Sequence, residues 1–465
     1  MKTRDSLLSL ENALAVLLCA IAGPASGAPP PLPPNPTPNI ISIANALQQA
    51  CNQLGVAASG VTLTPAQQDL AQRCAFFENA QSTPVALTAG YTAIVGQQIN
   101  ALGPQTKKFA TLQQDDVTAR LADLRHGRHG VSLSGLDLRG DDGRLLAAND
   151  AAAYLPADSS GGGATLMEGR LGLFLNGSVK VGSKGKSKNS FAFDIDDNSL
   201  TAGADYRITN WFVTGAAYGG GRTKTAFSGN LGRLDLDAKG LNVFASFYGS
   251  TYYLDILGGY GRTDLDTDRN LQFTESTSGT TINQQALGRS HIHDLWAGLS
   301  VGDALNWRQW SLTPEGSINF HEIRLDGFTE TMSQPTAPGA GLALSYGDAV
   351  VPSLQGRLGL RLGYTASTAW GVFQPQIHGT FIREFRNRAD KFTAQFAAAL
   401  TLPGGATPAF ISTDPPEGHY FANGGGISAQ FAHGVAAFID YEQLRTLKTI
   451  KAHEFSFGLR WQVGD

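Results

Sequence analysis

The stretch 454–463, EFSFGLRWQV, alternates strictly between apolar and polar or small residues. Successive side chains of an extended strand point to opposite faces, so its apolar residues share one face. These residues are Phe455, Phe457, Leu459, Trp461 and Val463, and Arg460 stands on the polar face. The stretch therefore predicts a strand that lies between an apolar and a polar environment.

The same alternation recurs far upstream. Leucines occupy every second position in 171–175 and again in 358–362, where Arg357 and Arg361 alternate with them. We assign the apolar face of these strands to lipid. It comprises Leu171, Leu173, Leu175, Leu358, Leu360, Leu362, Phe455, Phe457, Leu459 and Trp461. The charged residues of the opposite face are expected to point into a hydrated lumen, and they are Arg170, Asp205, Arg207, Glu315, Arg357, Arg361, Asp440, Glu442 and Arg460.

About twelve such segments follow one another, each near the roughly ten residues that a tilted membrane strand needs. Their centres lie near residues 175, 202, 216, 243, 257, 297, 315, 360, 377, 426, 439 and 458. Short turns alternate with long connections, which we expect at 182–190, 224–234, 263–286, 325–350 and 386–418. A soluble β-sandwich would also alternate along its strands, but it would not sort its loops by length. The pattern predicts an all-β membrane barrel of antiparallel strands at 167–465.

The composition excludes two further classes of protein. Among 465 residues, Gly contributes 55 and charged residues 16%, and the net charge is -4. This charge argues against a nucleic-acid partner, because a phosphate-binding face is basic. The mean hydropathy is -0.12, and beyond the first thirty residues no apolar run has the length of a spanning helix.

The N-terminus predicts export. A basic start, the apolar stretch 14–22 and small residues before Gly27 are typical of a signal peptide over 1–27, with cleavage between Gly27 and Ala28. The Pro-rich segment 28–40 is expected to be an extended, unpacked spacer. A helical segment is predicted over 41–128, with Thr64 as N-cap and Pro65 in the first turn of one helix. A linker is expected over 129–166.

Two cysteines remain after the signal peptide. Because exported proteins fold in an oxidising compartment, we predict a Cys51–Cys74 disulfide, and two buried free thiols are the alternative. Within 107–126, apolar residues including Val117 fall near one face of a predicted helix. One hypothesis places this helix inside the barrel, and the other packs it on the disulfide-linked hairpin outside. A shorter segment, 144–154, is a second candidate for a helix inside the barrel.

Three blocks resemble the autotransporter β-domain family: 199–221 (SLTAGADYRITNWFVTGAAYGGG), 312–330 (LTPEGSINFHEIRLDGFTE) and the final hairpin 441–463. The segment 117–138 is similar to the pre-barrel segment of a subgroup with short helical N-termini. The resemblance implies an outer-membrane barrel of a type V secretion system that passes its own N-terminal segment to the cell surface. The partners implied are outer-membrane lipid, the barrel assembly machinery and a surface ligand of the N-terminal segment.

Chemistry-bearing motifs are sparse. His291 and His293 would point the same way along a strand, but no third ligand is evident, so we assign no metal site. We expect no catalytic residue and no cofactor, and hence no enzyme. The alternatives to a translocator are a diffusion porin, whose N-terminal segment stays in the periplasm or plugs the pore, and an outer-membrane hydrolase.

Overall fold

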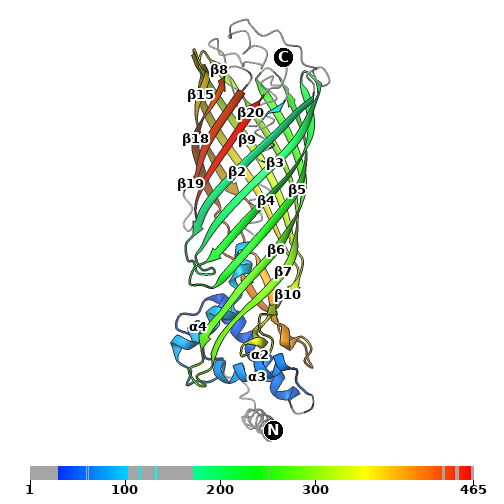
Figure 1. Ribbon diagram of the computed structural model, residues 1–465, viewed down its shortest axis with the longest axis vertical. Coiled ribbons are helices and arrows are strands. Elements are labelled where there is room, and N and C mark those ends of the chain that lie inside the picture. The colour runs from blue at the N-terminus through cyan, green and yellow to red at the C-terminus, as the bar shows by residue number, and fades with distance from the viewer. Residues whose placement is uncertain are drawn as a thin grey trace, which may run out of the picture.

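The computed structural model describes residues 30–58, 60, 62–102, 114, 117, 131–132, 171–249, 251–431, 435–445 and 450–461. Within them, twelve long antiparallel strands close into a barrel, with three α-helices of the N-terminal region at one end of it (Figure 1). This architecture confirms the fold class expected from the alternation. Among these residues no helix is both long and apolar enough to cross a membrane.

The barrel strands pair in chain order. They are β2 (Leu171–Lys184), β3 (Phe193–Thr209), β4 (Phe212–Phe227), β5 (Gly232–Tyr248), β6 (Tyr252–Thr274), β7 (Thr281–Asp303), β9 (Trp310–Leu325), β13 (Ala349–Tyr364), β15 (Gly371–Glu384), β18 (His419–Phe431), β19 (Val435–Arg445) and β20 (Ile450–Trp461). The ladder between β2 and β20 runs from Gly177 opposite Phe457 to Lys184 opposite Ile450 and closes the barrel. Each of the twelve expected strand centres lies inside one of these strands.

The two ends of the barrel differ in their connections. One end, which we call the turn end, carries the tight connections such as 210–211 and 249–251, and the short strands β8 (Leu305–Trp307) and β14 (Ala366–Thr368). The other, the loop end, carries 185–192, 326–348 and 385–418. Because β2 runs into the loop 185–192, it begins at the turn end. Since β20 is antiparallel to β2, the chain also leaves β20 at the turn end.

Two of the expected long loops are instead strand. Between β4 and β5 only 228–231 lies outside the ladder, and between β6 and β7 pairing continues to Thr274 opposite Thr281. The strands continue because their inward residues, such as Leu234 and Leu271, are buried in a core at the loop end. Their outward residues there are mostly polar, with Ala226 and Leu287 as exceptions, so the ladder extends beyond the apolar band.

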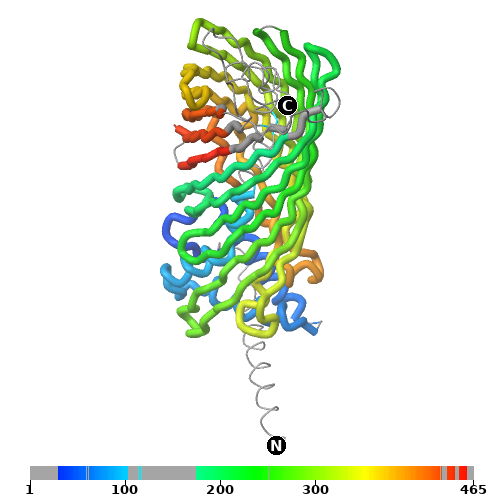
Figure 2. The backbone as a smooth tube through the Cα atoms, turned by 45° about the horizontal axis from the view of Figure 1, so that its top comes forward, coloured from blue at the N-terminus to red at the C-terminus, as the bar shows by residue number. Residues whose placement is uncertain are grey.

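The loops 326–348 and 385–418 form a second, four-stranded sheet. It contains β10 (Phe328–Thr329), β12 (Leu344–Tyr346), β16 (Lys391–Phe396) and β17 (Ala409–Ser412), with the short helices η4 (Ala340–Leu342) and η5 (Ala397–Ala399). Figure 2 shows the orange segment of this sheet beside the blue N-terminal helices, at the same end of the barrel. β11 (Thr331–Met332) pairs with β7, and β1 (Val131–Ser132) pairs in parallel with β2.

The N-terminal region folds into α2 (Pro38–Ala57), α3 (Pro65–Phe77), α4 (Pro84–Ile94) and the 3₁₀-helix η1 (Gln97–Ala101). Each α-helix has a Thr at its N-cap and Pro in its first turn, which satisfies an otherwise unpaired amide and presets the backbone. Thr64 is the N-cap of α3, as its position before Pro65 predicts, and it also forms a capping box with Gln67. The expectation of an unpacked spacer is wrong for its described part, because Pro30 and Pro33 are buried and Leu32 packs against the core.

Candidate functional site

The helices of residues 38–102, called the helical cap below, share a hydrophobic core with the loop end of the barrel. Residues of α2, α3 and α4, including Ile43, Phe77 and Tyr91, belong to one buried cluster with Phe273 and Ile282 of the β6–β7 hairpin. The rings of Phe77 and Phe273 lie 5.9 Å apart. The cap is therefore packed on the barrel as part of one structure, and is not tethered loosely to it.

A buried ion pair joins α3 to the β6–β7 hairpin. Arg73 Nη1 donates to Glu275 Oε1 at 2.6 Å, and both side chains are nearly inaccessible to solvent. The carboxylate of Asp69, one helical turn earlier, accepts the amides of Gly339 at 3.0 Å and Gly341 at 2.8 Å. Because an unpaired buried charge is costly, these contacts strongly favour one position of α3 on the loops.

A second buried ion pair lies beside α4. Arg269 of β6 is paired with Glu330, and its guanidinium also donates to the carbonyls of Ala93 and Leu342, each at 3.0 Å. Burial lowers the pKa of Arg269, but the charge and hydrogen bonds of Glu330 outweigh it and raise the pKa above its usual value. Glu330 also accepts the amide of Leu344 at 2.8 Å. One arginine thus connects a barrel strand, the cap and the loop sheet.

Further polar contacts run along α2 and η1. Asn39 accepts the amide of Ser412 at 2.8 Å and donates to its carbonyl at 3.0 Å, which continues the edge of β17 onto the cap. Gln98 of η1 donates to the carbonyl of Leu231 at 2.6 Å, and Asn100 donates to that of Asn189 at 2.7 Å. The cap therefore contacts several of the loop-end connections.

The turn before η1 requires glycine. Gly96 has φ +64°, a conformation that L side chains rarely adopt, and a Cβ at this position would collide with the hydroxyl of Tyr346. Tyr346 itself is buried, and burial together with the charge of Glu330 raises the pKa of its phenol. This turn directs η1 into the mouth of the barrel.

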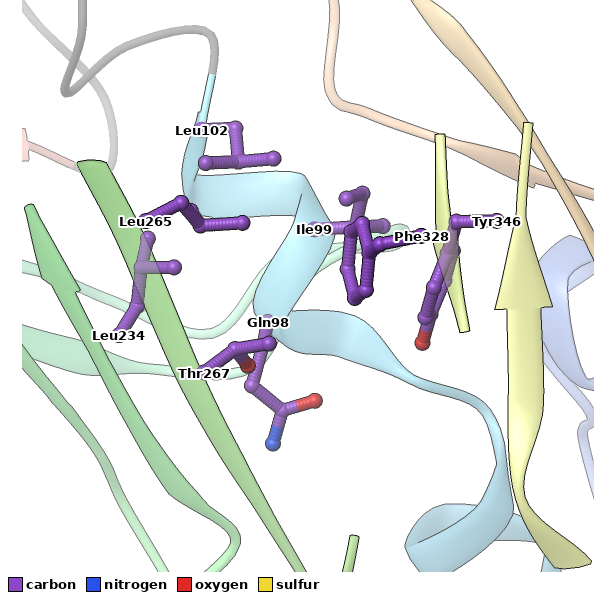
Figure 3. A pocket seen from close by; sticks show the side chains of 8 residues that line it. All are labelled: Gln98, Ile99, Leu102, Leu234, Leu265, Thr267, Phe328 and Tyr346. Atoms are coloured by element: carbon purple, nitrogen blue, oxygen red, sulfur yellow. The ribbon is translucent and has the colours of Figure 1, made fainter. Parts of the chain in front are cut away.

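Figure 3 shows η1 against the barrel wall, where a small cavity lies between Ile99, Leu102 and the strand residues Leu234 and Leu265. The remaining lining residues are Gln98, Thr267, Phe328 and Tyr346. Its walls are mainly apolar, and the amide of Gln98 is already engaged by Leu231. We interpret the cavity as imperfect packing where the cap fills the mouth.

Cys51 of α2 and Cys74 of α3 form a disulfide across 23 residues, with their Cα atoms 5.7 Å apart. Both cysteines are buried in the core that the cap shares with the loops. The bond links the two helices that carry Asn39 and Arg73, so it holds together the parts of the cap that contact the loop sheet and the β6–β7 hairpin.

Inside the barrel, Val117 contributes to a buried cluster of inward-facing residues. Its other members are Phe174, Val213, Ala217, Ala238, Phe244, Tyr248, Tyr253, Leu257 and Trp296, which come from β2 and β4 to β7. Gln114 and Val117 are helical and inaccessible to solvent. The rest of 107–126 and the whole of 144–154 lie outside the described residues. These two residues favour the hypothesis of a helix within the pore over packing on the cap.

Most of the charged residues expected in the lumen are turned inward. Asp205 is buried, and Arg207, Glu315, Arg357, Arg361, Asp440 and Glu442 are half-buried. Three of the carboxylates contact other inward residues: Tyr253 donates to Glu315 at 3.3 Å, and His378 lies 3.1 Å from Asp440 and 3.8 Å from Glu442. Arg170 lies outside the described residues, and the side chain of Arg460 is not described.

The residues expected to face lipid lie on the outer surface wherever their side chains are described. Leu175, Leu358, Leu360, Phe455 and Phe457 are exposed, with Leu358 at 67%, and Leu362 is half-buried. Leu171, Leu173, Leu459 and Trp461 belong to β2 and β20, but their side chains are not described. The cleavage site at Gly27 and Ala28 lies outside the described residues.

Sequence reasoning missed the ion pairs that dock the cap. Arg73 and Glu275 are 202 residues apart, and Arg269 and Glu330 are 61 apart, so no local pattern links them. His291 and His293 face outward together, as their spacing predicts, and bond to Asp264 and Tyr260. Among the described residues, no three His, Cys, Asp or Glu side chains are placed to hold a metal ion.

The comparisons with known proteins agree with this geometry. A family model described as the autotransporter β-domain matches residues 173–442, from β2 into β19. The chain belongs to the autotransporter β-domain family. The autotransporter barrel described above is therefore an outer-membrane translocator barrel. A search of the curated proteins found no match.

Solved structures of autotransporter domains are similar to this one. The translocator domain of autotransporter NalP from Neisseria meningitidis is 18% identical with a TM-score of 0.47, and the match covers 62% of this chain and 87% of that chain. The β domain of the Bordetella autotransporter Brka is 15% identical with a TM-score of 0.42, covering 63% and 99%. The transport unit of AIDA-I from Escherichia coli is 11% identical with a TM-score of 0.41, covering 70% and 99%.

Proposed function

We propose that this autotransporter barrel carries its own helical cap to the cell surface and retains it there, docked on the extracellular loops. Barrels of the outer membrane have short periplasmic turns and longer extracellular loops. By that rule the turn end faces the periplasm and the loop end faces the medium. The observation that carries the proposal is that the cap lies at the loop end, whereas β2 begins at the turn end.

The path of the chain supports the same proposal. The cap ends at Leu102 at the loop end, and the barrel begins at Leu171 at the turn end, so the chain between them must traverse the length of the barrel. Val117, between those two points, packs against the inner wall. A helix is suited to that position because it satisfies its own backbone hydrogen bonds without adding to the sheet.

The porin alternative is less well supported. An open channel needs a water-filled mouth, but the loop end is filled by the core that η1 shares with Leu234 and Leu265. We therefore propose a closed barrel that has no catalytic role of its own, inserted by the barrel assembly machinery as the family resemblance implies. A planar-bilayer measurement on the full chain should find little conductance. A large steady conductance would favour the porin.

An epitope test on intact cells addresses the orientation. An epitope inserted at Gly60, where an added side chain meets no neighbour, should bind antibody on intact cells. A matched epitope at Asn210, in the tight β3–β4 connection, should bind only after the outer membrane is permeabilised. If the Asn210 epitope were accessible on intact cells and the Gly60 epitope were not, the proposed display would be wrong.

A further inference from the structure

The outer face of β5, β6 and β7 changes character at one level. Toward the turn end, the outward residues of these strands are uncharged except Asp303 at the end of β7. The large outward residues nearest the change, Leu241, Tyr260 and Leu295, are each about half exposed. The next outward residue toward the loop end is basic on all three strands. These residues are Lys239, Arg262 and His293, called the basic row below.

The ladders place the members of the basic row side by side. Lys239 is directly opposite Arg262, and Arg262 is directly opposite His293. Cross-strand neighbours on one face lie about 4.5–5.5 Å apart at Cβ, and like charges directly opposite each other are destabilising. The arrangement therefore favours an anion that contacts more than one member of the row.

In the part of the chain that the structure describes, no nearby carboxylate makes a close contact with more than one member of the basic row. Lys239 Nζ lies 3.9 Å from Asp237 and Arg262 Nε lies 3.8 Å from Asp264, while both basic side chains are more than half exposed. His293 lies 3.5 Å from Asp326 and shares one hydrogen bond with the hydroxyl of Tyr260. Exposed pairs at such distances contribute little in water.

The neighbouring strand offers a contrast. Arg324 of β9 is directly opposite His293. Its guanidinium donates to Glu322 at 2.6 Å, and Glu322 stands opposite Leu295, at the level of the apolar band. Arg324 is thus engaged by a short pair on its own strand. The basic row consequently ends at His293.

We propose that the basic row binds the phosphate groups of anionic lipids in the outer leaflet. Lysine and arginine form charge-assisted hydrogen bonds to phosphate oxygens, and the planar guanidinium of Arg262 can form two at once. The row lies at the level where headgroups meet acyl chains, because the continuous band of exposed apolar residues ends directly beside it. Farther toward the loop end, Leu287 is the one apolar residue among the outward residues of β5, β6 and β7. This inference rests on the orientation in the proposed function, in which the loop end faces the medium, whereas binding of the lipid in detergent is measured independently of that orientation.

A lipid fits the surface better than free phosphate. The acyl chains of a lipid can cover Leu241, Tyr260 and Leu295 while its phosphate contacts Lys239 and Arg262. A free phosphate ion can contact only Lys239 and Arg262. Tyr260 suits this boundary, since tyrosine rings prefer the interface between hydrocarbon and headgroups. Its hydroxyl lies 2.7 Å from His293 Nδ1, so a residue of the apolar band is hydrogen-bonded to a residue of the basic row.

The test compares two double variants of the full chain, folded in a neutral detergent. Lys239→Gln/Arg262→Gln removes the row, and Lys224→Gln/Arg289→Gln removes two outward-facing charges farther toward the loop end. Binding of a bis-phosphorylated glycolipid of the lipid A type is measured by native mass spectrometry, beside the same lipid without phosphates. We expect the row variant to lose at least about tenfold in affinity, and the control to stay within about twofold.

Each outcome is decisive. Wild-type protein should also prefer the phosphorylated lipid by about tenfold, and inorganic phosphate at the same concentration should not displace it. Equal losses of affinity in both double variants would mean that the lipid is attracted non-specifically by surface charge. Unchanged affinity in the row variant would show that the basic row is not the binding site. Effective displacement by inorganic phosphate would overturn a lipid as the ligand. If the double variant does not fold, Arg262→Gln and Arg289→Gln alone are compared by the same criteria.

Discussion

Arg73 of the helical cap donates a 2.6 Å hydrogen bond to Glu275, at the tip of the β6–β7 hairpin, and both side chains are buried. The two residues are separated by 202 positions in the chain. This contact fixes a segment that precedes the barrel onto the end of the barrel farthest from the start of β2. It explains why the hairpin continues beyond the apolar band, because the extended strands provide the surface on which the cap docks.

Removing one partner of that ion pair should loosen the cap. Arg73→Met leaves the carboxylate of Glu275 buried and unpaired, which costs about 3–5 kcal/mol in such pairs. We expect faster hydrogen exchange of the α3 amides, while those of the barrel strands stay protected. Arg289→Met, which removes the exposed partner of Asp266, serves as the control and should leave exchange in α3 unchanged. Equal exchange in both variants would contradict a docking role.

Compensation provides a stricter version of this test. The double variant Arg73→Met/Glu275→Met removes both charges of this pair. Such replacements are often neutral or stabilising. Asp69, whose carboxylate also lies 3.3 Å from Arg73, keeps its hydrogen bonds to the amides of Gly339 and Gly341. Exchange in α3 should therefore return toward the wild-type rate, which would not happen if Arg73 acted through another partner.

The Cys51–Cys74 bond should stabilise the cap. Closing a loop of 23 residues contributes about 3 kcal/mol in the chain-entropy model. We expect non-reducing mass spectrometry of the mature protein to find the two cysteines linked. Cys51→Ser/Cys74→Ser should make the cap more sensitive to protease while the barrel still assembles. Two free thiols in the mature protein would refute the bond.

The inner and outer faces of the barrel should respond differently to charge. Leu358→Arg or Phe457→Lys would place a charge against lipid, at a cost of about 2–4 kcal/mol near the midplane, and should block assembly. Arg361→Ser and Arg460→Ser should assemble, because both positions belong to the face turned inward by the register. Heat-modified mobility in gels distinguishes folded from unfolded barrels. Similar behaviour of the two groups would mean that the proposed register is wrong.

The helix proposed for the pore can be located by crosslinking. With Cys51 and Cys74 replaced by Ser, Val117→Cys should crosslink through a short bismaleimide to Ala217→Cys, which faces inward on β4. The matched control is Ala216→Cys, the next residue of the same strand, which is exposed on the outer face. A crosslink to position 216 but not to 217 would place Val117 outside the barrel, and the proposed route of the chain would be lost.

Much of the barrel could be predicted from the sequence because strand alternation is a local property. Each lipid-facing strand has to place apolar and polar residues on opposite faces, so Leu358 and Arg361 already indicate their sides without knowledge of any other strand. A local pattern also located Thr64 and Pro65 at the start of a helix. The pairing of Cys51 with Cys74 followed instead from the export signal and from the two cysteines that remain after it.

The length of the β6–β7 hairpin and the docking of the cap were set by tertiary contacts. The polar outward residues of 263–286 resemble a loop when the inward partners are unknown, and Leu265 and Leu271 become core residues because the cap covers them. Arg73, Arg269 and Glu275 look like ordinary surface charges in the sequence. They form a docking site because folding removes them from water together, and the cost of burying a charge then selects the one arrangement in which each has its partner.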